Sequence, residues 1–306
     1  MRIAVLGAGG IGCYYGGALA RAGHRVALLA RGANLDALLA RGLEVRTADG
    51  NYSVKVEATD DPKRLGAADF AIISVKTYSL TEIAPAARLL AEAGATIVPL
   101  VNGVEAADRM QQAGIPRERI LGGLTQISAA RVGPGIVERR SPFQRVVVGE
   151  LAGGASERAE RIASAFRDAG ADASVSNDIV ADLWRKLAFI AAMATACGLA
   201  RSPIGPVRDA PLGSLLIERA VREAFTVARA RGVALGDDEE SKTLRFIESL
   251  GAAMKPSFLL DLESGGRTEL DDLSGAVSRL GREAGVATPV HDTATAALGV
   301  GISHEH

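Results

Sequence analysis

A glycine-rich turn near the N-terminus, GAGGIG at residues 7–12, is the feature that most limits what this chain can fold into. It directly follows the apolar run RIAVL, which predicts a buried strand, and it opens a segment with helical periodicity that continues to about Arg21. A strand, a glycine turn and a helix in this order form the first part of a βαβ unit. The chain is therefore expected to begin with a parallel α/β sheet.

Strand and helix patterns continue to alternate through the first half of the chain. RVALL, FAIISV and TIVPLV predict further buried strands, and NLDALLA and LTEIAPAARLLAEA predict helices. The runs LEVRT and YSVKVEA around an Asp-Gly turn predict a hairpin, and ILGGLTQISAA, RVVVGE and ADASVS predict later strands. Buried strands that alternate with helices indicate a mostly parallel, doubly wound sheet of the Rossmann type.

From about Asn177 the pattern changes to helices alone. NDIVADLWRKLAFIAAMATACGLA is helical, and three further segments with helical periodicity follow the break SPIGPVRDAP, which holds three prolines and a glycine. We therefore predict two domains, a Rossmann-type α/β domain at residues 1–175 and an all-helical domain at residues 176–306.

Charge and cysteine content exclude several classes of protein. The 35 basic and 36 acidic residues are well mixed, so no nucleic-acid partner is expected. Cys13 and Cys197 are far apart and the four histidines are scattered, so we expect no disulfide framework, no metal site and a cytoplasmic location. The apolar run at 187–200 is too short to span a bilayer, and the N-terminus lacks the pattern of a signal peptide, so no membrane partner is expected.

The glycine turn is the predicted cofactor site. Gly7 permits the tight turn, Gly9 lets the backbone approach a pyrophosphate, and Gly12 lets the helix pack closely on the strand. The N–H groups at the start of the helix can then bind the phosphates. A glycine turn without a ligand is the alternative, but the strand and helix on either side favour a dinucleotide. The predicted binding residues are Gly7, Ala8, Gly9, Gly10, Ile11 and Gly12.

The end of the second strand distinguishes NADP from NAD. An NAD site usually has Asp or Glu there, whereas this chain has Ala30 followed by Arg31. Arginine can bind a 2′-phosphate through its planar fork, so NADP(H) is favoured. The alternative is that Arg31 is an ordinary solvated arginine.

Two polar residues follow later strands, Lys76 in SVKTY and Asn102 in VNGVE. Ligands of doubly wound sheets bind beyond the carboxyl ends of the strands, so both residues are placed to meet a cofactor or substrate. As alternatives, Lys76 is simply solvated and Asn102-Gly103 is simply a turn.

Lys186 directly precedes fourteen residues without a charge, Leu187–Ala200. Such a run predicts a helix that is buried on nearly all sides. From periodicity alone, the lysine stem packs on the core while its amine reaches water.

The motifs GAGGIG, VKTY, VNG, WRKL and RTEL, in this order and at these separations, resemble those of ketopantoate reductase (2-dehydropantoate 2-reductase) over essentially the whole chain. The resemblance implies a Rossmann domain followed by a helical domain like the C-terminal domain of 6-phosphogluconate dehydrogenase, with the active site in the cleft between them. It also implies NADPH-dependent reduction of a 2-keto acid to a 2-hydroxy acid in pantothenate biosynthesis.

The resemblance also assigns roles to individual residues. The family's catalytic lysine falls on Lys186, where an ammonium can donate a proton and stabilise charge on the carbonyl oxygen. The substrate-binding glutamate, which we also expect to influence that lysine, falls on Glu269, and the carboxylate-binding serine falls on Ser257. The residues expected near the cofactor or substrate are Arg31, Lys76 and Asn102. Without the resemblance, the sequence around Glu269 predicts a solvated residue in the first turn of a helix.

The chain departs from the family at three positions where asparagines hold the substrate. Ile190, Ala194 and Ile204 replace them. We therefore expect a substrate with a more apolar or bulkier tail than ketopantoate, with Ala194 leaving room beside Ile190. Arg201 is a candidate to replace a carboxylate contact, and a solvated arginine is the alternative.

Two other functions compete with this interpretation. One is a related 3-hydroxy acid dehydrogenase with the same two-domain plan, which the R-T-E motif argues against. The other is a noncatalytic dinucleotide-binding regulator, which would be expected to lack Lys186 or Glu269. The sequence leaves the physiological substrate and the oligomeric state open, a homodimer included.

Overall fold

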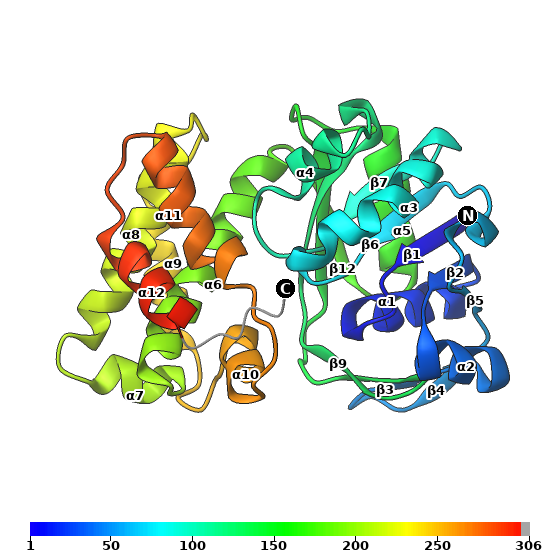
Figure 1. Ribbon diagram of the computed structural model, residues 1–306, viewed down its shortest axis with the longest axis horizontal. Helices are drawn as coiled ribbons and strands as arrows, with labels where there is room; N and C mark the ends of the chain where they lie inside the picture. The colour runs from blue at the N-terminus through cyan, green and yellow to red at the C-terminus, as the bar shows by residue number, and fades with distance from the viewer. Residues whose placement is uncertain (301–306) are drawn as a thin grey trace. The chain divides into compact units, whose positions relative to one another are not determined.

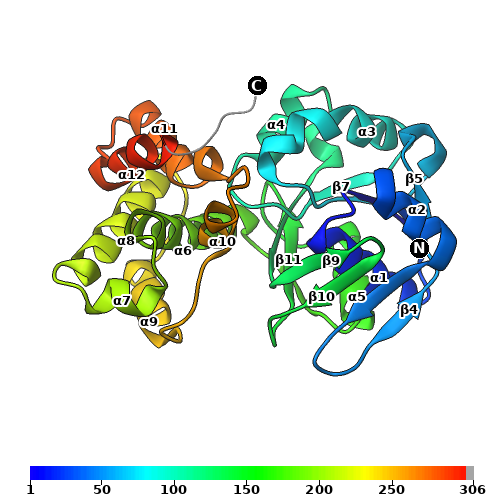
Figure 2. The ribbon, with the colours of Figure 1, turned by 60° about the horizontal axis from the view of Figure 1, so that its bottom comes forward.

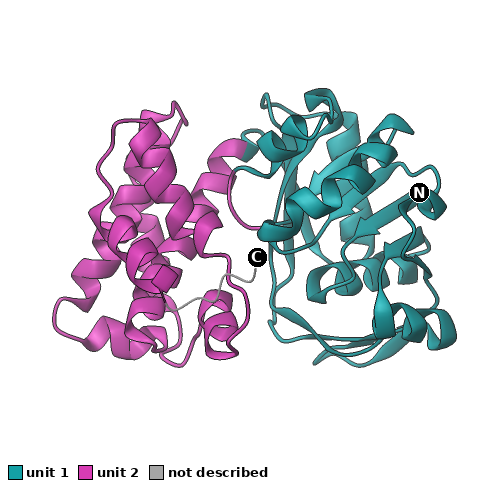
Figure 3. Cartoon of the chain, in the orientation of Figure 1, with its two compact units in different colours: residues 1–101, 105–179 teal, residues 102–104, 180–306 magenta. Residues whose placement is uncertain are grey.

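The computed structural model describes residues 1–300 and divides into two compact units, which Figure 3 draws in different colours. Unit 1 consists of Met1–Val101 and Glu105–Ile179, and unit 2 consists of Asn102–Val104 and the chain from Val180 onward. The units separate slightly after the expected boundary at 175, because the strand Asp172–Ser176 still pairs within unit 1. The expected second domain also included residues 301–306, which lie outside the described residues.

Five parallel strands form the main sheet of unit 1 (Figure 1). Their order across the sheet is β5 (Glu57–Thr59), β2 (Arg25–Leu29), β1 (Arg2–Leu6), β6 (Phe70–Ile73) and β7 (Thr96–Pro99). The chain builds outward from β1 on one side and then returns to β6 on the other side, so the switch point lies between β1 and β6. Ligands of doubly wound sheets bind beyond the carboxyl ends of the strands at such a point. The predicted Rossmann-type sheet is confirmed.

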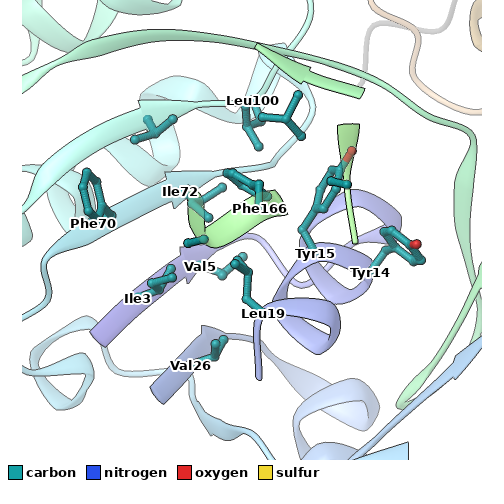
Figure 4. Close-up of a cluster of buried hydrophobic side chains, with 14 of the residues drawn as sticks. Ile3, Val5, Tyr14, Tyr15, Leu19, Val26, Phe70, Ile72, Leu100 and Phe166 are labelled. Carbon is teal, nitrogen blue, oxygen red and sulfur yellow. The ribbon is translucent and has the colours of Figure 1, made fainter. Parts of the chain in front are cut away.

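Helices cover both faces of this sheet because successive strand residues point to opposite faces. Ile3 and Val5 pack in one cluster with Tyr15, Leu19 and Phe166 (Figure 4). The alternate residues of β1 pack in a second cluster with the opposite helices. The helices of unit 1 are α1 (Gly10–Arg21), α2 (Gly32–Arg41), α3 (Leu80–Glu92), α4 (Ala106–Gln112) and α5 (Glu157–Asp168), with short 3-10 turns η1 (Pro62–Leu65), η2 (Thr77–Ser79) and η3 (Arg117–Arg119).

Two smaller sheets complete the described part of unit 1. One contains β12 (Asp172–Ser176), β11 (Arg145–Glu150) and β8 (Leu121–Gln126), and the other contains β4 (Tyr52–Val54), β3 (Leu43–Arg46), β10 (Ile136–Arg139) and β9 (Ala129–Gly133). The predicted hairpin is confirmed for β3 and β4, which pair antiparallel. The end of the second predicted run, Glu57 and Ala58, belongs to β5, which joins the main sheet instead. The β9–β10 hairpin, which the sequence analysis missed, packs against α1 and pairs with β3 (Figure 2).

The described part of unit 2 is helical, as predicted. Its elements are α6 (Ile179–Ala200), α7 (Ile204–Asp209), α8 (Gly213–Ala230), α9 (Glu239–Ser249), α10 (Ser257–Glu263), the short η4 (Leu270–Asp272), α11 (Ser274–Glu283) and α12 (Pro289–Val300). The apolar run after Lys186 forms most of α6, and its side chains pack in the core cluster of unit 2. Within residues 1–300, α6 alone is long and apolar enough to cross a membrane, but 67% of its apolar window is buried inside the protein, as in a core helix.

Candidate active site

The glycine turn packs tightly on the end of β6. Gly7 has a φ of +111°, which favours glycine, and Ser74 donates a 2.9 Å hydrogen bond from Oγ to its carbonyl oxygen. A Cβ on Gly12 would lie 2.0 Å from the carbonyl oxygen of Gly7 and 2.4 Å from Ser74 Oγ. Gly7 and Gly12 are therefore required by the packing of the chain on itself.

Gly9 and Gly10 serve different purposes. A Cβ on Gly10 would lie 2.2 Å from the carbonyl oxygen of Ala129, because β9 passes over the start of α1. A Cβ on Gly9 would meet nothing within 4 Å. The described chain thus gives no packing reason for glycine at position 9. Close approach of a ligand such as a pyrophosphate does give a reason.

The start of α1 suits an anion as well. Gly9 is the N-cap residue, so no side chain caps the first N–H groups of this 12-residue helix. Unsatisfied N–H groups and the helix dipole both favour negative charge at this position. The remaining turn residues are enclosed, with Ala8 buried and Ile11 partly buried. The residues present therefore fit the pyrophosphate of a dinucleotide.

The other predicted cofactor residues of unit 1 also follow strand ends. Arg31 comes after β2 as the N-cap of α2; its side chain is 80% exposed and pairs with Glu82, with 2.7 Å between Nη1 and Oε1. Lys76 comes after β6 as the N-cap of η2 and is partly buried. Because β1, β2 and β6 are parallel neighbours, the glycine turn, Arg31 and Lys76 share one edge of the main sheet.

Asn102 leaves unit 1 after β7 and meets Glu269 within unit 2. Its Nδ2 donates a hydrogen bond of 2.9 Å to Glu269 Oε2. Gly103 follows with a φ of +85°, and a Cβ there would lie 3.2 Å from the carbonyl oxygen of Asp272. The VNG segment therefore packs closely against the chain around η4. This contact makes Asn102 a positioning partner of Glu269.

Glu269 is not the solvated helix residue that its local pattern suggests. It is 4% exposed and is the N-cap residue of η4. Its carbonyl oxygen accepts hydrogen bonds of 3.1 Å from the N–H groups of Asp272 and Leu273. The main chain thus fixes the place of a buried carboxylate, and such a group needs charged or hydrogen-bonding partners.

Lys186 is one of those partners. It lies two turns inside α6, where its neighbours Trp184 and Leu187 are 4% and 0% exposed. Arg185 pairs with Asp182 and with Glu239, which anchors this part of α6. Burial lowers the pKa of the Lys186 ammonium from 10.5 to about 8, and the negative charge of Glu269 opposes that fall.

The pKa of the Lys186 ammonium is therefore close to neutral pH. With a pKa of about 8, Lys186 is mostly protonated at pH 7 and still gives up its proton readily. Unit 2 thus brings together three predicted residues, Lys186, Glu269 and Asn102. The Lys186 ammonium of this cluster suits a ligand that develops negative charge on an oxygen.

Ser257 is not joined to this cluster. It is the exposed first residue of α10, and no hydrogen bond connects it to Lys186, Asn102 or Glu269 in the described chain. The next residue, Phe258, packs against Gly198 near the end of α6. Its role in binding a carboxylate stays a prediction.

The three replaced asparagine positions differ in accessibility. Ile190 is partly buried one turn after Lys186 on the same face of α6, whereas Ala194 and Ile204 are both 0% exposed in the core of unit 2. The expectation that Ala194 leaves room beside Ile190 is therefore wrong, because the core encloses the Ala194 side chain. Arg201 follows α6 with a φ of +49° and is exposed.

A buried polar network, missed by the sequence analysis, ties α6 to neighbouring helices. Thr195 Oγ1 lies 2.8 Å from Ser274 Oγ and 3.3 Å from His291 Nδ1, and His291 Nε2 donates to the Ala220 carbonyl oxygen at 3.0 Å. Burial lowers the pKa of His291 to about 4, so the ring is neutral and Nδ1 accepts from Thr195. No local pattern marks these residues, because the four groups come from four different helices.

Comparison with known families matches both units. Residues 3–153 match the family described as "Ketopantoate reductase PanE/ApbA", and residues 178–300 match "Ketopantoate reductase PanE/ApbA C terminal". Together the two matches cover most of the chain and support the same family at both ends.

Individual relatives agree with this match along the whole chain. The chain is 32% identical over 298 residues to "Uncharacterized oxidoreductase YkpB" of Bacillus subtilis (strain 168), covering 97% of this chain and 98% of that protein. It is 31% identical over 294 residues to the 2-dehydropantoate 2-reductase of Halobacterium salinarum, covering 95% of each. The crystal structure of a PanE/ApbA family ketopantoate reductase from Ralstonia eutropha JMP134 matches with a TM-score of 0.88 and 30% identity over 98% of each chain.

Proposed function

The chain belongs to the ketopantoate reductase family and is an oxidoreductase, and we propose that it uses NADPH to reduce a 2-keto acid to the corresponding 2-hydroxy acid. The observation that carries this proposal is the cluster of Lys186, Glu269 and Asn102 in unit 2. The glycine turn of unit 1 supports it independently.

The nucleotide would be held by residues of unit 1. The N–H groups at the start of α1 bind its pyrophosphate, and the absence of a side chain at Gly9 allows the close approach. Arg31 and the lack of an acidic residue after β2 favour NADP(H) over NAD(H). When bound, the dinucleotide supplies a hydride to the carbonyl carbon of the substrate.

Lys186 supplies the proton that balances the reaction. As the carbonyl carbon is reduced, negative charge develops on the carbonyl oxygen, and the Lys186 ammonium stabilises that charge and donates a proton to it. The product is a 2-hydroxy acid, and Lys186 regains its proton from water. Its pKa of about 8 keeps enough ammonium present at neutral pH.

Glu269 and Asn102 hold this acid in its working state. The Glu269 carboxylate keeps Lys186 charged despite burial, and it can accept a hydrogen bond from a substrate hydroxyl. Asn102 donates to Oε2 of Glu269, which fixes the orientation of the carboxylate. Asn102 is therefore a positioning residue in this proposal, beside its predicted place near the nicotinamide and substrate.

We further propose that the substrate has a more apolar tail than ketopantoate. Ile190 carries this part of the proposal, because it lies one turn from Lys186 on the same helical face and cannot donate a hydrogen bond. Losing one hydrogen bond to a neutral hydroxyl costs about 0.5–1.5 kcal/mol, or about two- to tenfold in binding. Ala194 and Ile204 add nothing here, since both are enclosed in the core.

The reaction is tested with purified protein, NADPH and a panel of branched, linear and aromatic 2-keto acids. We expect NADPH oxidation that depends on the keto acid and yields the matching 2-hydroxy acid, and slower oxidation of NADH. If no 2-keto acid gives a 2-hydroxy acid with either cofactor, the proposed reaction is wrong.

The substrate tail is tested with a matched pair of keto acids. 3,3-Dimethyl-2-oxobutanoate is ketopantoate without its hydroxyl group, and we expect the protein to reduce it with equal or higher catalytic efficiency. Ile190→Asn should raise the ratio of the catalytic efficiency for ketopantoate to that for 3,3-dimethyl-2-oxobutanoate by about two- to tenfold. The control Ile190→Val should leave this ratio unchanged. A clear preference of the unmutated protein for ketopantoate would contradict this part of the proposal.

A further inference from the structure

Unit 1 contains a pocket of about 360 Å³ beyond the carboxyl end of β2. One wall comes from the start of α2 and the other from the β9–β10 hairpin, which lies beside α1 (Figure 2). Each wall contributes one arginine, Arg31 from the first and Arg131 from the second. The other lining residues are Ala33, Asn34, Val132, Gly133 and Pro134.

Both walls are fixed to the glycine turn within unit 1. Asn34 is 5% exposed; its Nδ2 donates to the carbonyl oxygen of Ala8 at 3.2 Å, and its Oδ1 accepts from the N–H group of Gly135 at 2.9 Å. One buried amide therefore joins α2, the nucleotide turn and the hairpin. The close approach of Ala129 to Gly10 holds the hairpin at a second point. The pocket is thus a built extension of the dinucleotide site.

The two arginines differ in their partners. Arg31 is paired with the Glu82 carboxylate at 2.7 Å. Arg131 is exposed on β9, and its side chain forms no ion pair or hydrogen bond with any residue in the described part of the chain. Its charge reaches the first turn of α1: burial raises the pKa of the Cys13 thiol to about 11, and a hydrogen bond from Asn34 and the charge of Arg131 both oppose that rise.

This charge balance matters for a phosphate ester. A phosphate monoester carries about two negative charges at neutral pH. Arg31 and Glu82 together contribute no net charge, so Arg31 by itself leaves such a group poorly compensated. Arg131 supplies the net positive charge of the pocket, and its planar fork can bind phosphate oxygens in pairs.

We propose that Arg131 binds the 2′-phosphate of NADP(H) together with Arg31, and that Arg131 is required for the preference for NADP(H) over NAD(H). The proposal rests on the dinucleotide site proposed above. It adds a specificity residue on β9, a strand outside the main sheet, whereas Arg31 is the N-cap residue of α2.

The role of Arg131 can be tested with two fragments of the cofactor, because their binding involves no catalytic step. The affinities of 2′,5′-ADP and 5′-AMP, which differ only in the 2′-phosphate, are measured by calorimetry for the unmutated protein, Arg131→Ala and Arg31→Ala. We expect Arg131→Ala to weaken 2′,5′-ADP binding by roughly ten- to a hundredfold and 5′-AMP binding by less than about threefold. Arg140→Ala is the matched control, because Arg140 is an exposed arginine near the same hairpin that pairs with Glu138.

The outcomes separate this proposal from the proposed function. If Arg131→Ala binds 2′,5′-ADP as tightly as the unmutated protein while Arg31→Ala does not, Arg131 has no role and the dinucleotide site stands. An equal loss for both fragments would mean that Arg131 contacts the adenosine, which also overturns the proposal. If the unmutated protein binds neither fragment nor NADPH, the proposed function itself fails. A thermal melt of each variant checks that the fold is retained.

Discussion

In unit 1 the candidate nucleotide-binding turn comes from six consecutive residues, whereas in unit 2 the candidate catalytic groups come from three segments, of which Asn102 and Glu269 are 167 residues apart. In the proposed function the turn binds its ligand through main-chain N–H groups and through the absence of side chains. In the same proposal the cluster in unit 2 works through an ammonium, a carboxylate and an amide that the fold of unit 2 brings together.

This difference indicates which substitutions should disrupt each kind of site. A main-chain site depends on local geometry, so a single added methyl group can block either the turn or its ligand. A side-chain site depends on the packing of whole helices, so its chemistry can be removed while the local structure survives. Substitutions in the two units should therefore separate effects on stability, on cofactor binding and on turnover.

The largest effect is expected for Lys186→Met, which keeps the apolar stem and removes the ammonium. Loss of proton donation and charge stabilisation should lower kcat by roughly 100- to 10,000-fold, while NADPH affinity and the melting temperature change little. Steady-state kinetics and calorimetry measure the two quantities. The control is Lys242→Ala, an exposed lysine of α9 that pairs with Asp238. Near-normal turnover of Lys186→Met would show that Lys186 is not the proton donor, and that its stem only packs on the core.

The next effect contrasts two glycines of the same turn. In Gly12→Ala the new Cβ would lie 2.0 Å from a carbonyl oxygen, so the turn must shift, at a cost of about 1–3 kcal/mol of unfolding free energy or more, and NADPH binding should be lost. In Gly9→Ala the Cβ enters open space, so stability should change by less than about 0.5 kcal/mol while NADPH affinity falls. Urea unfolding and calorimetry compare the two variants. Unchanged NADPH affinity in Gly9→Ala would show that no ligand approaches this face of the turn.

The polar network of unit 2 predicts a smaller effect on stability. Thr195→Val removes the hydroxyl that donates to His291 Nδ1 and lies 2.8 Å from Ser274 Oγ, and leaving buried polar groups unpaired costs about 1–3 kcal/mol. Thr226→Val is the control, since that exposed hydroxyl bonds only its own helix, at the Arg222 carbonyl oxygen. Equal unfolding free energies for the two variants would contradict a stabilising network.

The smallest effect is a shift in pH dependence. Lys186 must be protonated to donate, so kcat of the unmutated protein should fall as the pH rises above about 8. Glu269→Gln removes the carboxylate that raises the pKa of Lys186. The pH at which kcat falls should therefore decrease by roughly half to one unit. The control Glu263→Gln, which loses an exposed ion pair with Lys255, should leave the pH at which kcat falls unchanged. If the high-pH fall in kcat stays at the same pH in Glu269→Gln, the charge of Glu269 does not influence the pKa of Lys186.

Several features of the site were predictable because their signals are local. The glycine turn between β1 and α1, and the polar residues Arg31 and Lys76 after β2 and β6, stand where the alternating pattern places them. Lys186 and Glu269 could be named only through the resemblance to the family, because their own surroundings in the sequence suggest a surface lysine and a solvated helix residue.

The sequence by itself determined most of the order of strands and helices, the change from an α/β to a helical unit, and the glycine turn. Each depends on periodicity or turn chemistry within a few residues. Only the tertiary structure decided that Asn102 bonds Glu269, that Ala194 is enclosed while Ile190 is partly exposed, and that Arg131 lies across a pocket from Arg31. Contacts between distant segments follow from the packing of whole elements, and no short stretch of sequence carries that information.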